Sequence, residues 1–187
     1  YQATIARPAF DEAERAYPDG EAYWQADPAA HDAWVAEIDA LNRAVRSESD
    51  EEARQLARQF LDLRQSRRSE FSMPEALIRY EQRIEWLEGM AKYVELGMLR
   101  AAARSPDYAS VPTMDAVRSF DGYGFTDRFW AQELSQMQRQ ANREGDARFY
   151  YTGWAQGLLL DRFSPEWQEQ VLQGAWLEEV FAEAISN

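Results

Sequence analysis

The stretch YEQRIEWLEGMAKYVELGML, from Tyr80 to Leu99, decides the predicted fold. Its apolar residues recur with the period of an α-helix, and nothing in it alternates as a strand does. They occupy two sides of the helical wheel: Tyr80, Ile84, Leu87, Met90, Ala91, Val94 and Met98 on one side, and Trp86, Tyr93 and Leu96 on the other. A helix with two apolar sides is expected to be buried at the centre of a helical bundle.

Capping signals place this stretch inside one long helix, from about residue 73 to about residue 104. In the segment SMPE, Ser72 suits the capping position, Pro74 suits the first turn, and Glu75 completes a capping box. The segment SPD that follows Arg104 ends the helix, because the residue before a proline avoids the helical conformation.

Helical periodicity also dominates the rest of the chain. A second capping box, formed by Ser49 and Glu52, marks the start of the preceding helix. Further helices are expected at about residues 29–46, 47–71, 126–144, 147–163, 164–174 and 175–185. The predicted fold is therefore all-α, an irregular bundle of about six or seven helices around the central long helix.

The chain has 187 residues, and 45% of them are hydrophobic, which is enough for a sizeable core. We expect residues 1–187 to form a single helical domain. The chain starts at Tyr1 without an initiator methionine, and Tyr1–Arg7 resembles the end of a helix whose start is missing. We therefore expect this domain to be the C-terminal lobe of a longer protein.

Charge and composition narrow the classes of partner. The formal net charge of −13 repels nucleic acid and anionic membranes, so we expect neither as a partner. No apolar run reaches the roughly 18 residues that a membrane span requires. The chain has no cysteine and only one histidine, His31, so thiol chemistry, thiolate metal sites and a histidine cluster are all excluded within it. The composition fits any compartment, an extracytoplasmic one included.

Four glutamates of the opening stretch fall within about 80° of arc, between the two apolar sides of the helix. They are Glu81, Glu85, Glu88 and Glu95. A carboxylate near a core is costly unless it is paired, hydrogen-bonded or bound to a metal. One interpretation is ion pairing, with Lys92 one turn after Glu88 and with the arginines Arg64, Arg67 and Arg68 of the previous helix. The other interpretation is a functional site.

The segment RIEWLEGMAKYVE resembles the second zinc-binding helix of gluzincin-type metallopeptidases. That family pairs an H-E-x-x-H helix with a downstream helix that carries a Glu ligand, often followed by Gly or Ala and a Tyr. Glu88 occupies the place of the ligand, and Gly89 after it permits close approach of another backbone. The segments FLDLRQSRR and FYYTGWAQGLLLDRFSPEWQEQV are similar to parts of uncharacterised bacterial gluzincin-like proteins, so the resemblance covers most of the chain.

The resemblance implies a zinc-dependent hydrolase that cleaves a peptide or protein substrate. Glu88 would be the third zinc ligand, and Glu85 would orient a histidine ligand through its second ring N–H. The chain contains no H-E-x-x-H, so an N-terminal segment or a separate chain would have to supply both histidines and the general-base glutamate. We therefore expect this chain alone to bind zinc weakly and to be inactive. We also expect the Cα atoms of Tyr1 and Glu88 to lie on the order of 10–18 Å apart.

Two tyrosines and the histidine are further candidates. The resemblance makes Tyr150 and Tyr151 candidates for stabilising the oxyanion of a tetrahedral intermediate, although aromatic residues at helical spacing are usually part of a core. His31, with Asp27 and Asp32 nearby, is a candidate metal ligand, but a solvated or capping histidine is the expectation. The alternative function is a non-catalytic helical interaction module whose glutamates form structural ion pairs.

Overall fold

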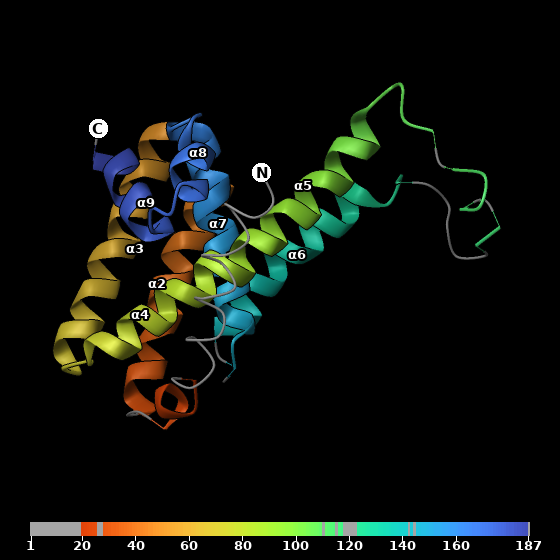
Figure 1. Ribbon diagram of the computed structural model, residues 1–187. Coiled ribbons are helices and arrows are strands. Elements are labelled where there is room, and N and C mark those ends of the chain that lie inside the picture. The colour runs from red at the N-terminus through yellow and green to blue at the C-terminus, as the bar shows by residue number, and fades with distance from the viewer. Residues whose placement is uncertain are drawn as a thin grey trace.

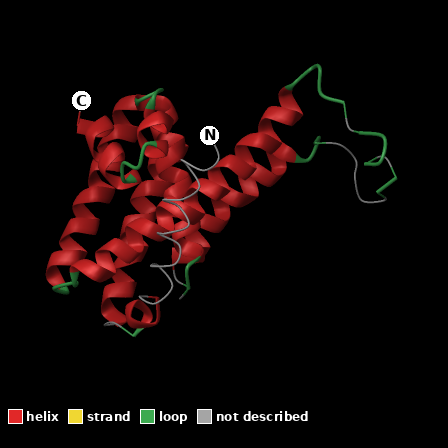
Figure 2. Ribbon diagram, in the orientation of Figure 1, coloured by secondary structure: helices red, strands yellow, loops and turns green. Residues whose placement is uncertain are grey.

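The computed structural model describes residues 20–25, 28–109, 111–114, 116–117, 123–141, 143 and 145–186. Within these ranges the chain forms helices, turns and loops and contains no strand (Figure 2). The predicted all-α fold is thus confirmed. Within the same ranges, no helix is long and apolar enough to cross a membrane. Tyr1 and Asp27 lie outside the described residues, so the expected distance from Tyr1 to Glu88 and the expected position of Asp27 near His31 stay predictions.

The helices lie close to where the sequence places them (Figure 1). They are α2 (Pro28–Arg46), α3 (Asp50–Glu70), α4 (Glu75–Ile84), the π-helical turn η1 (Glu85–Gly89), α5 (Met90–Arg104), α6 (Thr126–Ala141), α7 (Ala147–Phe163), α8 (Trp167–Leu172) and α9 (Leu177–Ser186). Residues 20–24 are helical as well.

The start of α3 follows the predicted capping box with one addition. The hydroxyl of Ser49 accepts a hydrogen bond from the backbone N–H of Glu52 at 3.3 Å. The carboxylate of Glu52 accepts from the hydroxyl of Ser47 at 2.6 Å, and this hydroxyl accepts from the backbone N–H of Ser49 at 3.2 Å. The box therefore closes through a second serine, which still satisfies the free N–H groups at the helix start.

The predicted capping box of Ser72 and Glu75 is wrong. Ser72 has a φ of 48°, in the left-handed region, and the N-cap of α4 is Pro74, which forms no side-chain cap. The N–H of Met73 reaches the carbonyl of Arg68 at 2.9 Å, and the N–H of Ser72 reaches that of Ser69 at 3.1 Å. These two bonds form a Schellman motif, so Ser72 ends α3 and does not start α4.

The expected long helix is continuous in space but not regular, because η1 separates α4 from α5. At this turn the chain lies directly against α7. A Cβ atom added to Gly89 would lie 2.5 Å from the Cα of Gly153, and one added to Gly153 would lie 2.4 Å from the carbonyl oxygen of Glu85. The two backbones therefore touch at these glycines, and the close approach expected at Gly89 is confirmed.

The centre of the bundle is shared between η1 and α7. Eleven of the 17 residues of α7 are buried, whereas in α5 only Leu96 is buried. Val94 and Met98 of α5 are 52% and 67% exposed, since the second half of α5 runs beside α6 away from the other helices (Figure 1). Burial on two sides therefore holds for α4 and η1 but not for the whole of α5.

Candidate functional site

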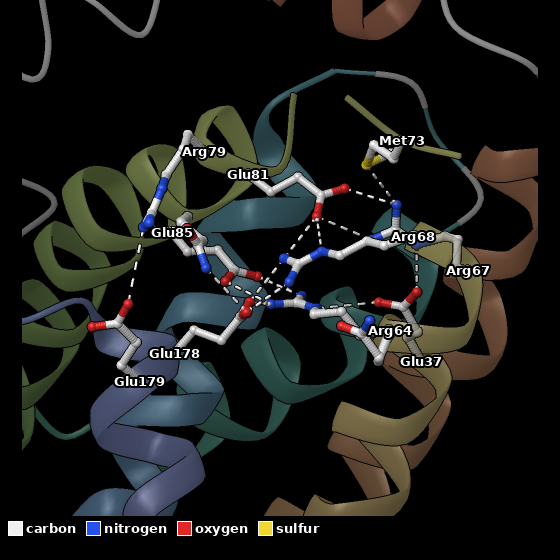
Figure 3. A network of polar contacts seen from close by, with 12 residues as sticks. Glu37, Arg64, Arg67, Arg68, Met73, Arg79, Glu81, Glu85, Glu178 and Glu179 are labelled. Atoms are coloured by element: carbon white, nitrogen blue, oxygen red, sulfur yellow. Dashed lines mark hydrogen bonds and ion pairs between the residues drawn. The ribbon is translucent and has the colours of Figure 1, made fainter. Parts of the chain in front are cut away.

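Three arginines from the end of α3 lie inside the bundle and not on its surface. Arg64, Arg67 and Arg68 are 1%, 2% and 7% exposed. Figure 3 shows their guanidinium groups meeting carboxylates that come from α2, α4, η1 and α9. These carboxylates belong to Glu37, Glu81, Glu85 and Glu178. We call these seven side chains the arginine network.

Glu85, in the first position of η1, pairs with Arg64 in the arginine network. Its two oxygens accept hydrogen bonds from Arg64 at 2.7 and 2.8 Å, in the two-pronged geometry that suits a guanidinium and a carboxylate. Thr152 and Gln156 of α7 donate to the same carboxylate at 2.5 and 3.0 Å. Four donors thus hold a side chain that is 1% exposed. Its predicted role in orienting a histidine ligand stays a prediction.

Glu81 is held in the same way, one turn earlier in α4. Arg67 lies 2.8 Å from one of its oxygens, and Arg68 lies 2.9 Å from the other. The hydroxyl of Tyr23 donates to it at 2.9 Å. Burial raises the pKa of the Glu81 carboxyl, but Arg67 and Arg68 outweigh burial, so the pKa is lowered. The predicted pairing of the α3 arginines with these glutamates is therefore confirmed for Glu81 and Glu85.

The other two carboxylates of the network differ in how well they are compensated. At Glu178 burial again raises the pKa, but Arg64 and Arg68 outweigh it and lower the pKa to about 2. At Glu37 burial prevails over Arg67 and Arg64, and the pKa is raised. Glu37 accepts from Arg67 at 2.5 Å and from Arg64 at 3.3 Å.

A fourth cation balances the charges of the network. Four glutamates face three arginines within it, and Arg148 of α7 lies close enough for Glu81 and Glu37 to affect its pKa. Arg148 is 2% exposed, and its guanidinium carbon lies 4.8 Å from the ring centre of Trp24. Burial lowers the pKa of this guanidinium. With Arg148 counted, the four glutamates and four arginines carry equal and opposite formal charge.

Glu88 lies outside the arginine network, although it belongs to the same π-turn as Glu85. Its side chain is half-buried. Within the described ranges, no side chain forms a hydrogen bond or an ion pair with it. The predicted pair between Glu88 and Lys92 is wrong, because the ammonium of Lys92 is bound by Glu133 of α6. Of the two carboxylates in η1, that of Glu88 is therefore the one with no bond to a described side chain.

Lys92, one turn after Glu88, is the only lysine of the chain. Its ammonium nitrogen bonds to Glu133 and lies 4.5 Å from the ring centre of Tyr151 and 5.8 Å from that of Trp154. The hydroxyl of Tyr151 donates to the same oxygen of Glu133 at 3.1 Å. Burial first, and then Glu133, raise the pKa of Tyr151, so its hydroxyl keeps its proton at neutral pH.

The two tyrosine candidates lie on different sides of α7. Tyr151 is buried and joins Lys92 and Glu133 between α5, α6 and α7. Tyr150 is half-buried and lies close enough to Tyr80 of α4 to affect its pKa. Tyr151, and not Tyr150, therefore lies beside Lys92, which is one turn after Glu88.

His31 is packed among aromatic rings, so the expected solvated position is wrong, whereas a capping role stays a prediction. It is 9% exposed and lies in the first turn of α2. Its ring stacks on Tyr23 with 5.6 Å between centres and meets the edge of Trp24 at 5.1 Å. In the part of the chain that the structure describes, no three acidic, histidine or cysteine side chains are grouped as metal ligands.

Sequence reasoning missed two members of the arginine network, Glu37 and Glu178, and also Thr152 and Gln156, which donate to Glu85. Glu37 carried a usable signal, because it falls within the apolar stripe of α2 between Trp34 and Leu41. A charged residue at such a position needs a buried partner. Glu178 gave no such signal, since it lies in the first turn of α9, where acidic residues are common for another reason.

Comparison with known proteins leaves the family open. No protein-family model, no curated protein and no solved structure matches the chain.

Proposed function

We propose that this chain is a helical lobe of a zinc-dependent peptidase-like protein, in which Glu88 is the carboxylate ligand. One observation carries the proposal: η1 fixes Glu85 inside the arginine network and leaves Glu88 of the same turn half-exposed and unbonded within the described residues. Single π-turns inside α-helices are frequent at functional sites. A ligand held on such a rigid turn loses little freedom on binding.

The donor set of this chain fits one position of a zinc site and not a complete one. A carboxylate oxygen is an ordinary zinc ligand, and such a site needs three protein ligands in all. Two histidines would therefore have to come from another segment or another chain. A zinc ion held there would supply the Lewis acidity for hydrolysis of a peptide bond.

Other residues of this chain would hold Glu88 in position and donate a hydrogen bond to the substrate. The four hydrogen bonds to Glu85 keep η1 in place, and the contact of Gly89 with Gly153 fixes its distance from α7. Tyr151 carries a protonated hydroxyl beside Lys92, as a donor to a developing oxyanion needs. In this arrangement the hydroxyl of Tyr151 exchanges its bond to Glu133 for one to the substrate.

The zinc content of the complete gene product tests the proposal. We expect about one zinc per molecule of the full-length protein by plasma mass spectrometry, and a loss of most of it in Glu88→Ala. Glu95→Ala is the matched control, because Glu95 lies on the same helix, is exposed and should leave the zinc in place. A full-length protein without zinc, or an unchanged zinc content in Glu88→Ala, would contradict the proposal.

A non-catalytic interaction module is the second candidate function. It is favoured by the finding that Glu81 and Glu85, two of the four glutamates of the opening stretch, form buried ion pairs. Such a module needs no zinc, so the same metal analysis separates the two candidates.

A further inference from the structure

An apolar groove of about 340 Å³ lies between α8 and the helix formed by η1 and α5. Its walls are formed chiefly by Trp86, Leu87, Met90, Trp167, Val171 and Leu172. Two of its lining residues are largely exposed, Leu172 at 58% and Val94 at 52%. Groups of large apolar side chains at a surface mark binding sites more often than single ones do.

The groove is held in shape by contacts beneath it. Tyr93 meets Trp167 edge to face, with 5.2 Å between ring centres. Gly157 of α7 makes room for this ring, since a Cβ there would lie 2.9 Å from Tyr93. A preformed apolar site loses little entropy when it binds a ligand.

An acidic residue lies beside the groove. The exposed carboxylate of Asp161 accepts hydrogen bonds from Tyr93 at 2.8 Å, from Trp167 at 3.0 Å and from Gln168 at 3.1 Å. These donors come from groove residues, so the carboxylate is fixed beside the apolar surface. The net charge of −13 extends the same sign of potential over the molecule.

We propose that this groove binds a segment of a partner protein that presents large apolar side chains next to lysine or arginine. The apolar walls select the first feature, and Asp161 together with the overall charge selects the second. A second copy of the chain fits less well, because two molecules of charge −13 repel each other. The same repulsion disfavours an anionic lipid surface.

This inference does not depend on the zinc proposal. Val94, at the groove, follows Lys92 by two residues, which places the two about 200° apart around α5. Glu88, Lys92 and Tyr151, on which the zinc proposal rests, are not among the residues that line the groove. The zinc proposal is tested by the zinc content of the protein, and the groove proposal is tested by peptide binding. Failure of one therefore leaves the other unaffected.

The experiment uses a labelled amphipathic peptide of about 14 residues, LKKLLKL repeated twice, and follows its fluorescence anisotropy at roughly 150 mM salt. We expect wild-type protein to bind it and Leu172→Glu to bind it about tenfold more weakly. This variant adds negative charge, so a general attraction would strengthen binding instead. Val35→Glu, at another exposed apolar position, is the matched control and should not weaken binding. Asp161→Asn should weaken it.

Three results would overturn the proposal. If Leu172→Glu and Val35→Glu bound the peptide equally well, general charge attraction alone would explain the binding. If the acidic peptide LEELLEL, repeated twice, bound as tightly as the basic peptide, the basic residues of the partner would play no part in recognition. Dimerisation of the free protein in sedimentation experiments, abolished by Leu172→Glu, would make a second copy the occupant of the groove.

Discussion

Glu85 and Glu88 stand three residues apart in the same π-turn and differ in every property that decides a role. Glu85 is 1% exposed and accepts four hydrogen bonds, whereas Glu88 is half-buried and bonds to no side chain in the described ranges. Removal of the charge of a buried carboxylate leaves its arginine partner buried and unpaired. Removal of the charge of an exposed carboxylate leaves no buried group without a partner. We therefore expect stability to depend on the first residue and ligand binding to depend on the second.

Replacement of each carboxylate by its amide measures this division. We expect Glu85→Gln to lower the free energy of unfolding by about 3 kcal/mol, since Arg64 would lose a buried charge partner. Glu88→Gln should change it by less than about 0.5 kcal/mol. Urea titration followed by tryptophan fluorescence gives both values. Equal losses in the two variants would show that Glu88 is a structural residue as well.

The low pKa of Glu178 predicts a defined dependence on pH. Its folded-state pKa of about 2 lies below the ordinary value of 4.5, so its contribution to stability is complete above pH 4.5. The contribution is lost as the pH falls from 4.5 toward 2, because the unfolded chain then binds the proton more readily. We expect Glu178→Gln to be less stable than wild type by about 3 kcal/mol at pH 7, with the difference shrinking below pH 4.5.

The neighbouring residue provides the control for this titration. Glu179 lies beside Glu178 in α9, but its side chain is 60% exposed. Unfolding of Glu179→Gln should follow that of wild type at every pH. A difference between wild type and Glu178→Gln that stays constant from pH 7 to pH 3 would contradict the assigned role of Glu178.

At the scale of the elements, local signals in the sequence predicted most helices, and contacts between helices decided the rest. Ser49 capped α3 as expected, since its partners lie within three residues. Ser72 did not cap α4, because the chain between α3 and α4 is too short for both a helix end and a separate cap. The π-turn had no local signal that was recognised, as it depends on Gly153, more than 60 residues later.

The contact between η1 and α7 can be tested at its glycines. In Gly153→Ala the added Cβ would meet the carbonyl oxygen of Glu85 at 2.4 Å, so the two helices must separate. We expect a loss of about 1–3 kcal/mol in stability. In Gly97→Ala nothing lies within 4 Å of the added Cβ, and the variant should gain about 0.5–1 kcal/mol. Thermal unfolding followed by circular dichroism compares them, and an equal effect of both would disprove the close contact.

At the scale of the whole molecule, the bundle combines a rigid interior with a projecting pair of helices. The arginine network joins five elements across the bundle: α2, α3, α4, η1 and α9 (Figure 3). The second half of α5 contacts α6 through Arg100, which lies 4.3 Å over the ring of Trp130, and Trp130 in turn meets Trp154 of α7 edge to face at 5.1 Å. Rigid elements of this kind suit a lobe that presents one ligand to a site completed elsewhere.

The sequence predicted the all-α class, which the structure confirms, but it did not predict the full set of charges in the arginine network. Arginines in α3 and glutamates in α4 are close in sequence, so their pairing could be predicted from adjacent helices. Glu178 and Arg148 come from α9 and α7, and no periodicity within one segment shows which distant residues will meet.

The most direct test of the central claim is the effect of zinc on the melting temperature of the full-length gene product. A ligand that binds only the folded state raises this temperature, and the rise disappears when its binding site is lost. We predict that added zinc raises the melting temperature of wild type and of Glu95→Gln by several degrees but leaves that of Glu88→Gln unchanged. An equal rise in Glu88→Gln, or none in wild type, would contradict the account.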